Sequence, residues 1–196
     1  MGKEKMNGAR GYEIRLSGTG GQGLGLSGKM LAAALSSDGL HVAQSQSYEP
    51  TSRGGMSRSD LVVTLGIASY PLATALDYLL ILDQRAAPVS DGMIKSKAVV
   101  LVDEELVPEP PSGDFKVHAL PLSKTAIALG NLRVTNVVSL GALIALTEIC
   151  SLSTLEAAIE RITPKKYAQM NLDAVRAGYE LVGSGNHFPP GSGAQE

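Results

Sequence analysis

Cysteine is almost absent from this sequence, since Cys150 is the only one in 196 residues. A single thiol cannot form a disulfide within the chain, and it cannot supply an all-cysteine zinc or iron-sulfur site. We therefore assign no metal-binding residues from the sequence. A reducing, cytoplasmic setting fits this composition.

An excess of charge of one sign and long apolar runs are also lacking. Seventeen basic and nineteen acidic residues leave a formal net charge of -2, so overall electrostatics favour neither nucleic acid nor an anionic membrane. The most apolar segment, residues 134–149, contains polar residues and falls short of the roughly 20 residues that cross a bilayer. Residues 1–11 lack the apolar stretch of a signal peptide. We expect no nucleic-acid or membrane partner.

The length fits one domain, and a hydrophobic content of 44% is sufficient for a buried core. Residues 1–11 are predicted to be a flexible N-terminus. Residues 12–182 are predicted to form a single α/β domain. Residues 183–196 consist largely of Gly, Ser and Pro, which predicts a disordered tail.

Short runs rich in Val, Ile and Leu alternate with segments rich in helix formers, which is typical of strands covered by helices on both faces. The predicted fold is a three-layer α/β/α, Rossmann-like arrangement with a mainly parallel sheet. The predicted strands are residues 13–17, 42–47, 61–65, 78–82, 98–102 and 116–120. The predicted helices are residues 26–37, 84–91, 123–129, 135–149, 153–162 and 171–182.

Several polar residues carry local predictions. Ser153 and Glu156 have the spacing of a capping box at the start of a helix. Asn136 and Asn171 are each expected to cap a helix, with a hydrogen bond to a partner chain as the alternative. The acidic run at residues 103–105 resembles a pair of catalytic carboxylates, but the adjacent prolines favour a solvated loop. No residue is therefore assigned as catalytic.

The strongest motif is a glycine cluster, G-T-G-G-Q-G, that follows the first predicted strand and precedes the first predicted helix. It has the spacing G-x-G-x-x-G in the structural context that this motif requires. Residues without Cβ atoms can adopt positive φ and let a phosphate or carboxylate reach backbone N-H groups at a helix N-terminus. The candidate anion-binding residues are Gly20, Gly21, Gln22 and Gly23.

Three other interpretations of this cluster remain open. A dinucleotide site requires an acidic residue near the end of the second strand, where the sequence reads A-Q-S-Q-S. A P-loop frame over residues 23–28 continues with Lys29 but has Met30 in place of the magnesium-binding Ser or Thr. Alternatively, the glycines only permit a tight strand-to-helix turn.

A second segment, S-Y-E-P-T-S-R-G-G-M-S-R-S-D, follows the second predicted strand. It should lie at the same C-terminal edge of the sheet as the glycine cluster, where open α/β sheets bind ligands. Arg53 offers a planar fork for phosphate or carboxylate, and Gly54 and Gly55 free the backbone beside it. Arg58 is expected to pair with Asp60 or with an acid of another subunit. The alternative is two solvated arginines on a flexible loop.

Together the two segments resemble the gamma subunit of the 2-oxoacid:ferredoxin oxidoreductases. The shared pattern is G-x-G-G-Q-G followed by S-Y-x-P-x-x-R-G-G-x-S-R-S-D. The resemblance continues through L-G-N, V-T-N-V-V-S-L-G-A-L and N-L-D-A-V-R-A-G-Y, so that it covers roughly residues 12–181. Glu49 and Met56 depart from the pattern, which leaves the substrate undefined.

The resemblance implies a subunit of a complex that decarboxylates a 2-oxoacid oxidatively, and it implies that the chain is inactive alone. Alpha, beta and delta subunits would be its partners, with thiamine diphosphate, magnesium and iron-sulfur clusters held by those subunits. Ferredoxin would accept the electrons and coenzyme A the acyl group. The substrate could be pyruvate, ketoisovalerate or 2-oxoglutarate, and overall likeness favours 2-oxoglutarate. The isolated chain could form a homodimer.

In such a complex, the two loops are expected to bind phosphate groups of coenzyme A or to close over the thiamine site. Two different functions remain as alternatives. One is a stand-alone Rossmann-like nucleotide-binding module. The other is a structural subunit whose glycines and arginines serve only subunit packing.

Overall fold

A six-stranded sheet forms the centre of the computed structural model, which describes residues 11–49, 55–66 and 72–183. The predicted flexible N-terminus and disordered tail fall almost entirely outside these residues. The strands are β1 (Tyr12–Thr19), β2 (His41–Tyr48), β3 (Met56–Thr64), β4 (Leu76–Ile81), β5 (Ile94–Asp103) and β6 (Lys116–Leu120). The helices are α1 (Leu24–Ser37), α2 (Leu122–Ala128), α3 (Thr135–Thr147), α4 (Leu152–Ile162) and α5 (Lys165–Gly183), with 3-10 helices η2 (Gln84–Ser90) and η3 (Leu132–Val134).

The strand order is β2-β3-β1-β4-β5-β6. The pairs β1-β4, β4-β5 and β5-β6 are parallel, whereas β3 is antiparallel to both β1 and β2. All strands except β3 therefore run in one direction. The reversal of β3 has a local cause, because a parallel neighbour of β2 would need a long crossover and only residues 49–55 connect the two strands.

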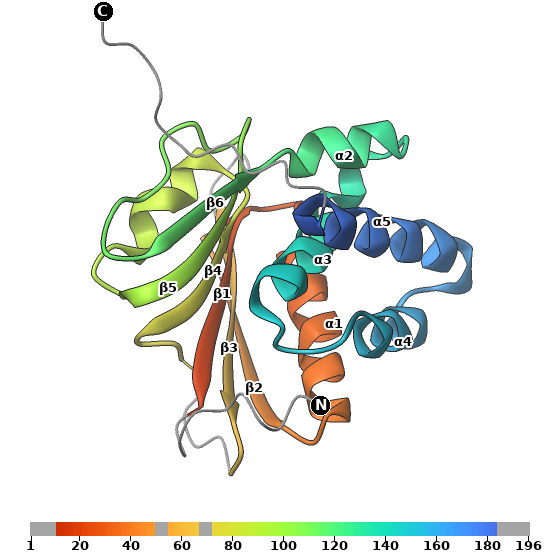
Figure 1. The fold of residues 1–196 in the computed structure, drawn as a ribbon, viewed down its shortest axis with the longest axis horizontal. Coiled ribbons are helices and arrows are strands. Elements are labelled where there is room, and N and C mark those ends of the chain that lie inside the picture. The colour runs from red at the N-terminus through yellow and green to blue at the C-terminus, as the bar shows by residue number, and fades with distance from the viewer. Residues whose placement is uncertain (1–10, 50–54, 67–71, 184–196) are drawn as a thin grey trace, which may run out of the picture.

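Two hydrophobic clusters lie on opposite faces of the sheet. The larger cluster joins β1, β3 and β5 to the five α-helices, with Ile14, Leu16 and Leu61 fully buried. The smaller cluster packs Leu79 and Ile81 against η2. Figure 1 shows the α-helices on one face of the sheet and η2 on the other. The α/β class and the mainly parallel sheet are thus confirmed, and η2 provides a thin third layer.

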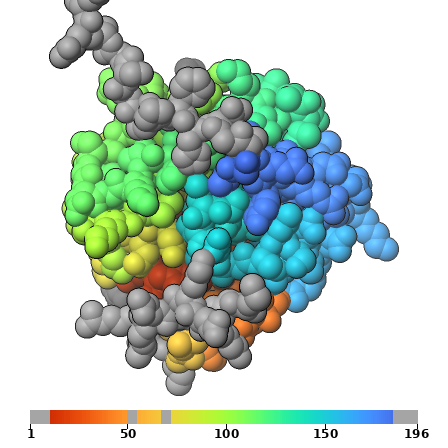
Figure 2. Space-filling model, in the orientation of Figure 1, coloured from red at the N-terminus to blue at the C-terminus, as the bar shows by residue number. Residues whose placement is uncertain are grey.

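Helix α3 is the buried helix that the apolar segment predicted, with every residue from Thr135 to Ile144 buried. It crosses α5 at very short range, because a Cβ on Gly178 would clash with the carbonyl of Val138 and one on Gly141 would clash with that of Val175. In the space-filling view, α3 lies between the strands β4 to β6 and the blue helix α5 (Figure 2). No helix among the described residues is long and apolar enough to span a bilayer.

Helices α4 and α5 begin earlier than predicted. The cap of α4 is Ser151, whose Oγ accepts a hydrogen bond from the Thr154 N-H at 3.0 Å, so the capping box of Ser153 and Glu156 is wrong. Ser153 already lies in the first turn, and the Glu156 carboxylate instead binds Arg176, with 2.6 Å between Oε1 and Nε. Helix α5 begins at Lys165, six residues before the predicted start.

Candidate functional site

The glycine cluster and the segment that follows β2 meet at one edge of the sheet, as predicted. The Gly20 N-H donates a hydrogen bond to the Gly55 carbonyl over 2.9 Å, and the Tyr48 ring lies against Gly20. The meeting follows from the topology, since β1 and β2 end at this edge and β3 begins there. Arg53 and Gly54, the other predicted site residues of this segment, lie outside the described residues.

The Gln22 side chain holds the glycine turn in place. Its Oε1 accepts a hydrogen bond from the Thr19 N-H at 2.7 Å, and its Nε2 donates to the Leu82 carbonyl at 2.8 Å. Gln22 therefore ties the end of β1 to the end of β4. Because both ends of its amide are used within the chain, a ligand at this turn would meet backbone N-H groups rather than the Gln22 side chain.

The N-terminus of α1 has no side-chain cap. Its N-cap residue is Gly23, with a left-handed φ of 73°, and its first turn contains no acidic residue. The first N-H groups of a helix lack intrahelical acceptors and sit at the positive end of the helix dipole. Gly21, with φ of 92°, and Gly23 are exposed, so the backbone of this turn is open to an approaching anion.

Asn136 is a site residue whose predicted role as a helix cap is wrong. It caps no helix but lies within the first turn of α3, where its Nδ2 donates to Ser27 Oγ at 2.9 Å and to the Gly23 carbonyl at 3.3 Å. Asn171 likewise lies inside α5 and donates to Thr163 Oγ1. A buried amide in an otherwise apolar helix was the available signal, because a buried polar group requires partners. Asn136 fixes the glycine turn against α3.

Polar side chains also occupy the face of β1 and β3 that lies away from α1. The Arg15 guanidinium pairs with both carboxylate oxygens of Asp60 at 2.8 Å, and it also contacts Ser90 Oγ at 3.3 Å. Arg15 and Asp60 are both buried. The expected pairing of Arg58 with Asp60 is therefore wrong, because Arg15 on the neighbouring strand lies directly opposite Asp60.

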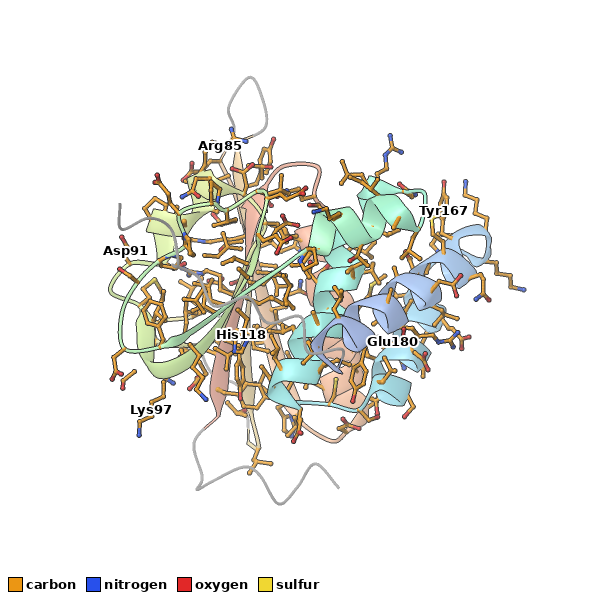
Figure 3. The ribbon with its side chains drawn as sticks, turned by 45° about the horizontal axis from the view of Figure 1, so that its top comes forward. Arg85, Asp91, Lys97, His118, Tyr167 and Glu180 are labelled. Carbon is orange, nitrogen blue, oxygen red and sulfur yellow. The ribbon has the colours of Figure 1, made fainter. Side chains whose placement is uncertain are left out.

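The start of η2 adds a second carboxylate to this edge. Asp83 Oδ1 accepts hydrogen bonds from the Arg85 N-H and Nε, both at 3.0 Å. Partial burial acts to raise the pKa of Asp83, but the hydrogen bonds and charge of Arg85 outweigh it and lower the pKa. Arg85 lies at this edge of the sheet in Figure 3. Asp83 is thus ionised at neutral pH and committed to the start of η2.

The acidic run at residues 103–105 is not a solvated loop throughout. Asp103 is fully buried, and its carboxylate accepts hydrogen bonds from the N-H groups of Glu105, Leu106 and Ser123. The three bonds account for a structural role in which Asp103 fixes both the turn after β5 and the start of α2. Across the described ranges, no group of three His, Cys, Asp or Glu side chains is arranged to hold a metal ion.

Comparison with known proteins defines the class. Residues 13–181 match the family described as pyruvate ferredoxin/flavodoxin oxidoreductase, and the chain belongs to this family. A solved gamma subunit of a keto/oxoacid ferredoxin oxidoreductase from Geobacter sulfurreducens PCA is 36% identical, with a TM-score of 0.78, over 88% of this chain and 99% of that one. The predicted resemblance to the gamma subunits of 2-oxoacid:ferredoxin oxidoreductases is confirmed.

Curated relatives show which members of this family the chain is similar to. The 2-oxoglutarate synthase subunit KorC of Methanocaldococcus jannaschii is 40% identical over 87% of this chain and 93% of its own length. KorC of Methanothermobacter thermautotrophicus is 36% identical over 89% of this chain and 96% of its own length. The chain is therefore a gamma-type subunit of an oxidoreductase complex, and its sequence is similar to subunits named for 2-oxoglutarate.

Proposed function

We propose that this chain is the gamma subunit of a thiamine-diphosphate-dependent 2-oxoglutarate:ferredoxin oxidoreductase of the cytoplasm. Its partners are alpha, beta and delta subunits, which hold thiamine diphosphate, magnesium and the iron-sulfur clusters. The complex releases the carboxylate of the 2-oxoacid as carbon dioxide and transfers the acyl group to the thiol of coenzyme A. Two electrons pass singly to two ferredoxin molecules.

The choice of 2-oxoglutarate rests on graded similarity. Four relatives named as 2-oxoglutarate synthase subunits are 33–40% identical to this chain. Relatives named for pyruvate or ketoisovalerate are 27–30% identical. The test is to purify the chain with its native partners and to measure ferredoxin reduction with several 2-oxoacids. Faster turnover of pyruvate than of 2-oxoglutarate would contradict the assignment.

Within the complex, we place the phosphate groups of coenzyme A at the glycine turn, bound by Gly20, Gly21, Gln22 and Gly23 with Arg53, Gly54 and Gly55. The observation that carries this role is the uncapped start of α1 beside Gly55, because free N-H donors and a positive dipole end favour an anion. The chain binds and orients the co-substrate, while its partners carry out the bond-breaking steps.

Gly21 allows a direct test of this role. It is exposed, with open space where a side chain would project and with positive φ that Asp and Asn tolerate better than other residues. Gly21→Asp places a negative charge beside the bound phosphate, whereas Gly21→Asn is a matched neutral control. One charge at about 6 Å weakens binding by 1 kcal/mol or more, so KM for coenzyme A should rise about tenfold in Gly21→Asp relative to Gly21→Asn. Equal KM values would remove the turn from the coenzyme A site.

Arg53→Ala tests the second loop in the same assay, and unchanged affinity for coenzyme A would remove Arg53 from the proposal. The alternative function, a stand-alone nucleotide-binding module, predicts that the isolated chain binds NAD or ATP. The second strand reads A-Q-S-Q-S where a dinucleotide site requires an acidic residue, which disfavours this alternative. Thermal stabilisation of the isolated chain by NAD or ATP would favour the alternative.

A further inference from the structure

A small pocket lies on the η2 face of the sheet, at the edge where β1 and β2 end and β3 begins. It has a volume of about 50 Å³. Its lining is Ser17, Gly18, Ser47, Glu49, Met56, Ser57, Arg58, Ala86 and Val89. Helix α1 packs on the other face of the sheet, so the sheet separates this pocket from that helix.

The strand register explains why hydroxyl groups and a guanidinium gather here. Arg58 of β3 lies directly opposite Ser17 of β1 on one side and Ser47 of β2 on the other. Residues directly opposite on neighbouring strands point to the same face of the sheet. The three side chains therefore line one pocket, and Ala86 and Val89 of η2 form its apolar wall.

Ser17 shows that the pocket is an incomplete polar site. The Ser17 side chain is 2% exposed, and its Oγ has no hydrogen-bond partner within the described residues. Leaving a buried hydroxyl unsatisfied is costly, and such groups in native proteins usually bind a water, ion or ligand. Ser17 is one of the residues that line the pocket, and its buried hydroxyl is the unsatisfied donor nearest to a group bound there.

Charge defines the kind of group. Arg58 makes no hydrogen bond or ion pair with another described residue, and the nearby Asp60 is already committed to Arg15 through two bonds of 2.8 Å. Arg58 is thus a cation in the pocket lining with which no carboxylate of the described residues forms an ion pair. The exposed carboxylate of Glu49 also lines the pocket, but it carries a single charge in contact with solvent, where screening is strong.

Size limits the ligand further. The volume is about a third of that of an engineered apolar cavity that accepts benzene, roughly 150 Å³, and it lies far below the roughly 300 Å³ of the smallest drug-sized sites. A nucleobase or a pantetheine arm does not fit. A carboxylate or phosphate group fits, and it accepts hydrogen bonds from hydroxyls and from a guanidinium.

We propose that this pocket is an oxyanion subsite in which Arg58 supplies the charge and Ser17 and Ser47 supply hydrogen bonds to a carboxylate or phosphate group. Two sources have this chemistry, an acidic side chain of a partner subunit and a phosphate group of coenzyme A. The choice between the sources rests on the proposed function. The existence of the subsite does not, because it follows from residues of this chain alone.

The first experiment uses the full chain by itself. Its melting temperature is measured against increasing inorganic phosphate or acetate, with chloride at equal ionic strength as the reference. Wild type should be stabilised specifically by phosphate or acetate, and Arg58→Gln should weaken that binding by about tenfold or more, since a charge-assisted bond is lost. Arg58→Lys should lie between the two. Arg133→Gln, which removes an exposed charge outside the pocket, should match wild type.

Ser17→Ala separates a binding role from a structural one. Removing an unsatisfied buried hydroxyl should leave the anion-free melting temperature unchanged or raised, while the shift induced by phosphate or acetate should become smaller. A hydroxyl needed only for the fold would lower the anion-free melting temperature instead. Equal stabilisation by chloride, or anion shifts that do not change in Arg58→Gln and Ser17→Ala, would overturn the proposal.

The second experiment uses the assembled complex to identify the source. If the group is a phosphate of coenzyme A, Arg58→Gln raises KM for coenzyme A while the subunits still co-elute. If it is a partner carboxylate, Arg58→Gln weakens co-elution, and the wild-type complex loses the phosphate response of the isolated chain. If the complex fails to reduce ferredoxin with every 2-oxoacid tested, the proposed function is refuted. The result on the isolated chain would still stand.

Discussion

The buried pair of Arg15 and Asp60 supports a quantitative prediction about stability. Replacing Asp60 by Asn keeps the shape of the side chain but leaves the Arg15 guanidinium buried without a counter-charge. The two side chains are only 2% and 4% exposed, so water cannot replace the lost partner. Breaking a buried pair from one side costs about 3–5 kcal/mol. A domain of this kind has a total stability of about 5–15 kcal/mol, so the loss is a large part of the whole.

Urea denaturation followed by circular dichroism measures this loss. Asp60→Asn should lower the free energy of unfolding by about 3–5 kcal/mol and the melting temperature by roughly 6–20 °C, at 2–4 °C per kcal/mol for a chain of this size. The double substitution Arg15→Met with Asp60→Leu should recover most of the loss, because it removes both charges. Glu105→Gln, at an exposed ion pair with Lys124, is the control and should change stability by about 1 kcal/mol or less. A loss below about 1 kcal/mol in Asp60→Asn would show that solvent reaches Arg15 and would refute the reasoning.

Three further predictions concern other parts of the fold. Gly178→Ala should lower the free energy of unfolding by about 1–3 kcal/mol or more, because the added Cβ would meet the α3 backbone. The control is Gly183→Ala, whose Cβ would meet no atom and which should have little effect in the same denaturation assay. Gln22→Ala should cost about 1–3 kcal/mol and speed hydrogen exchange at the Thr19 amide, which loses its acceptor; unchanged exchange would contradict this. Burial raises the pKa of the Cys150 thiol from 9.0 to about 12, so the folded state keeps this proton longer than the unfolded state. The contribution of this thiol to the free energy of unfolding should therefore be fully present below pH 9 and decrease as the pH rises toward 12. The decrease in stability should be less steep in Cys150→Ala. A pH titration of the melting temperature would check the sign.

The elements of this fold were predictable because each carries a local pattern. An apolar run marks part of each of the six strands in the sheet, and spacing marks the glycine turn. However, β3 begins at Met56, five residues before the predicted run at 61–65, because its first half is polar and carries no apolar pattern. The turn and the segment after β2 meet as expected at Gly20 and Gly55. The antiparallel direction of β3 could also be predicted, because the connection between β2 and β3 is too short for a parallel crossover. The length of the connection between two strands therefore indicates whether they can be parallel.

Pairings across strands were not predictable in the same way. Arg15 and Asp60 are 45 residues apart, and nothing in either local sequence indicates that they lie opposite each other. Arg58 with Asp60 was the natural expectation, because the two residues are close in sequence and side chains two apart on a strand point to the same face. Arg15 on the neighbouring strand lies directly opposite Asp60 and pairs with it instead. The role of Asn136 depends in the same way on how α3 packs against the glycine turn.

The register of β3 sets both the core and the candidate oxyanion subsite. Leu61 and Val63 face the α-helices, while Arg58 and Asp60 face η2. A slip of one residue would exchange the two faces, placing both charges against the apolar cluster and both apolar side chains against Arg15. That exchange is strongly unfavourable, because buried unpaired charges and lost apolar burial would add together. The same hydrophobic alternation that aligns the strand therefore also places Arg58 opposite Ser17 on the η2 face, so the register alone brings the two residues of the subsite together.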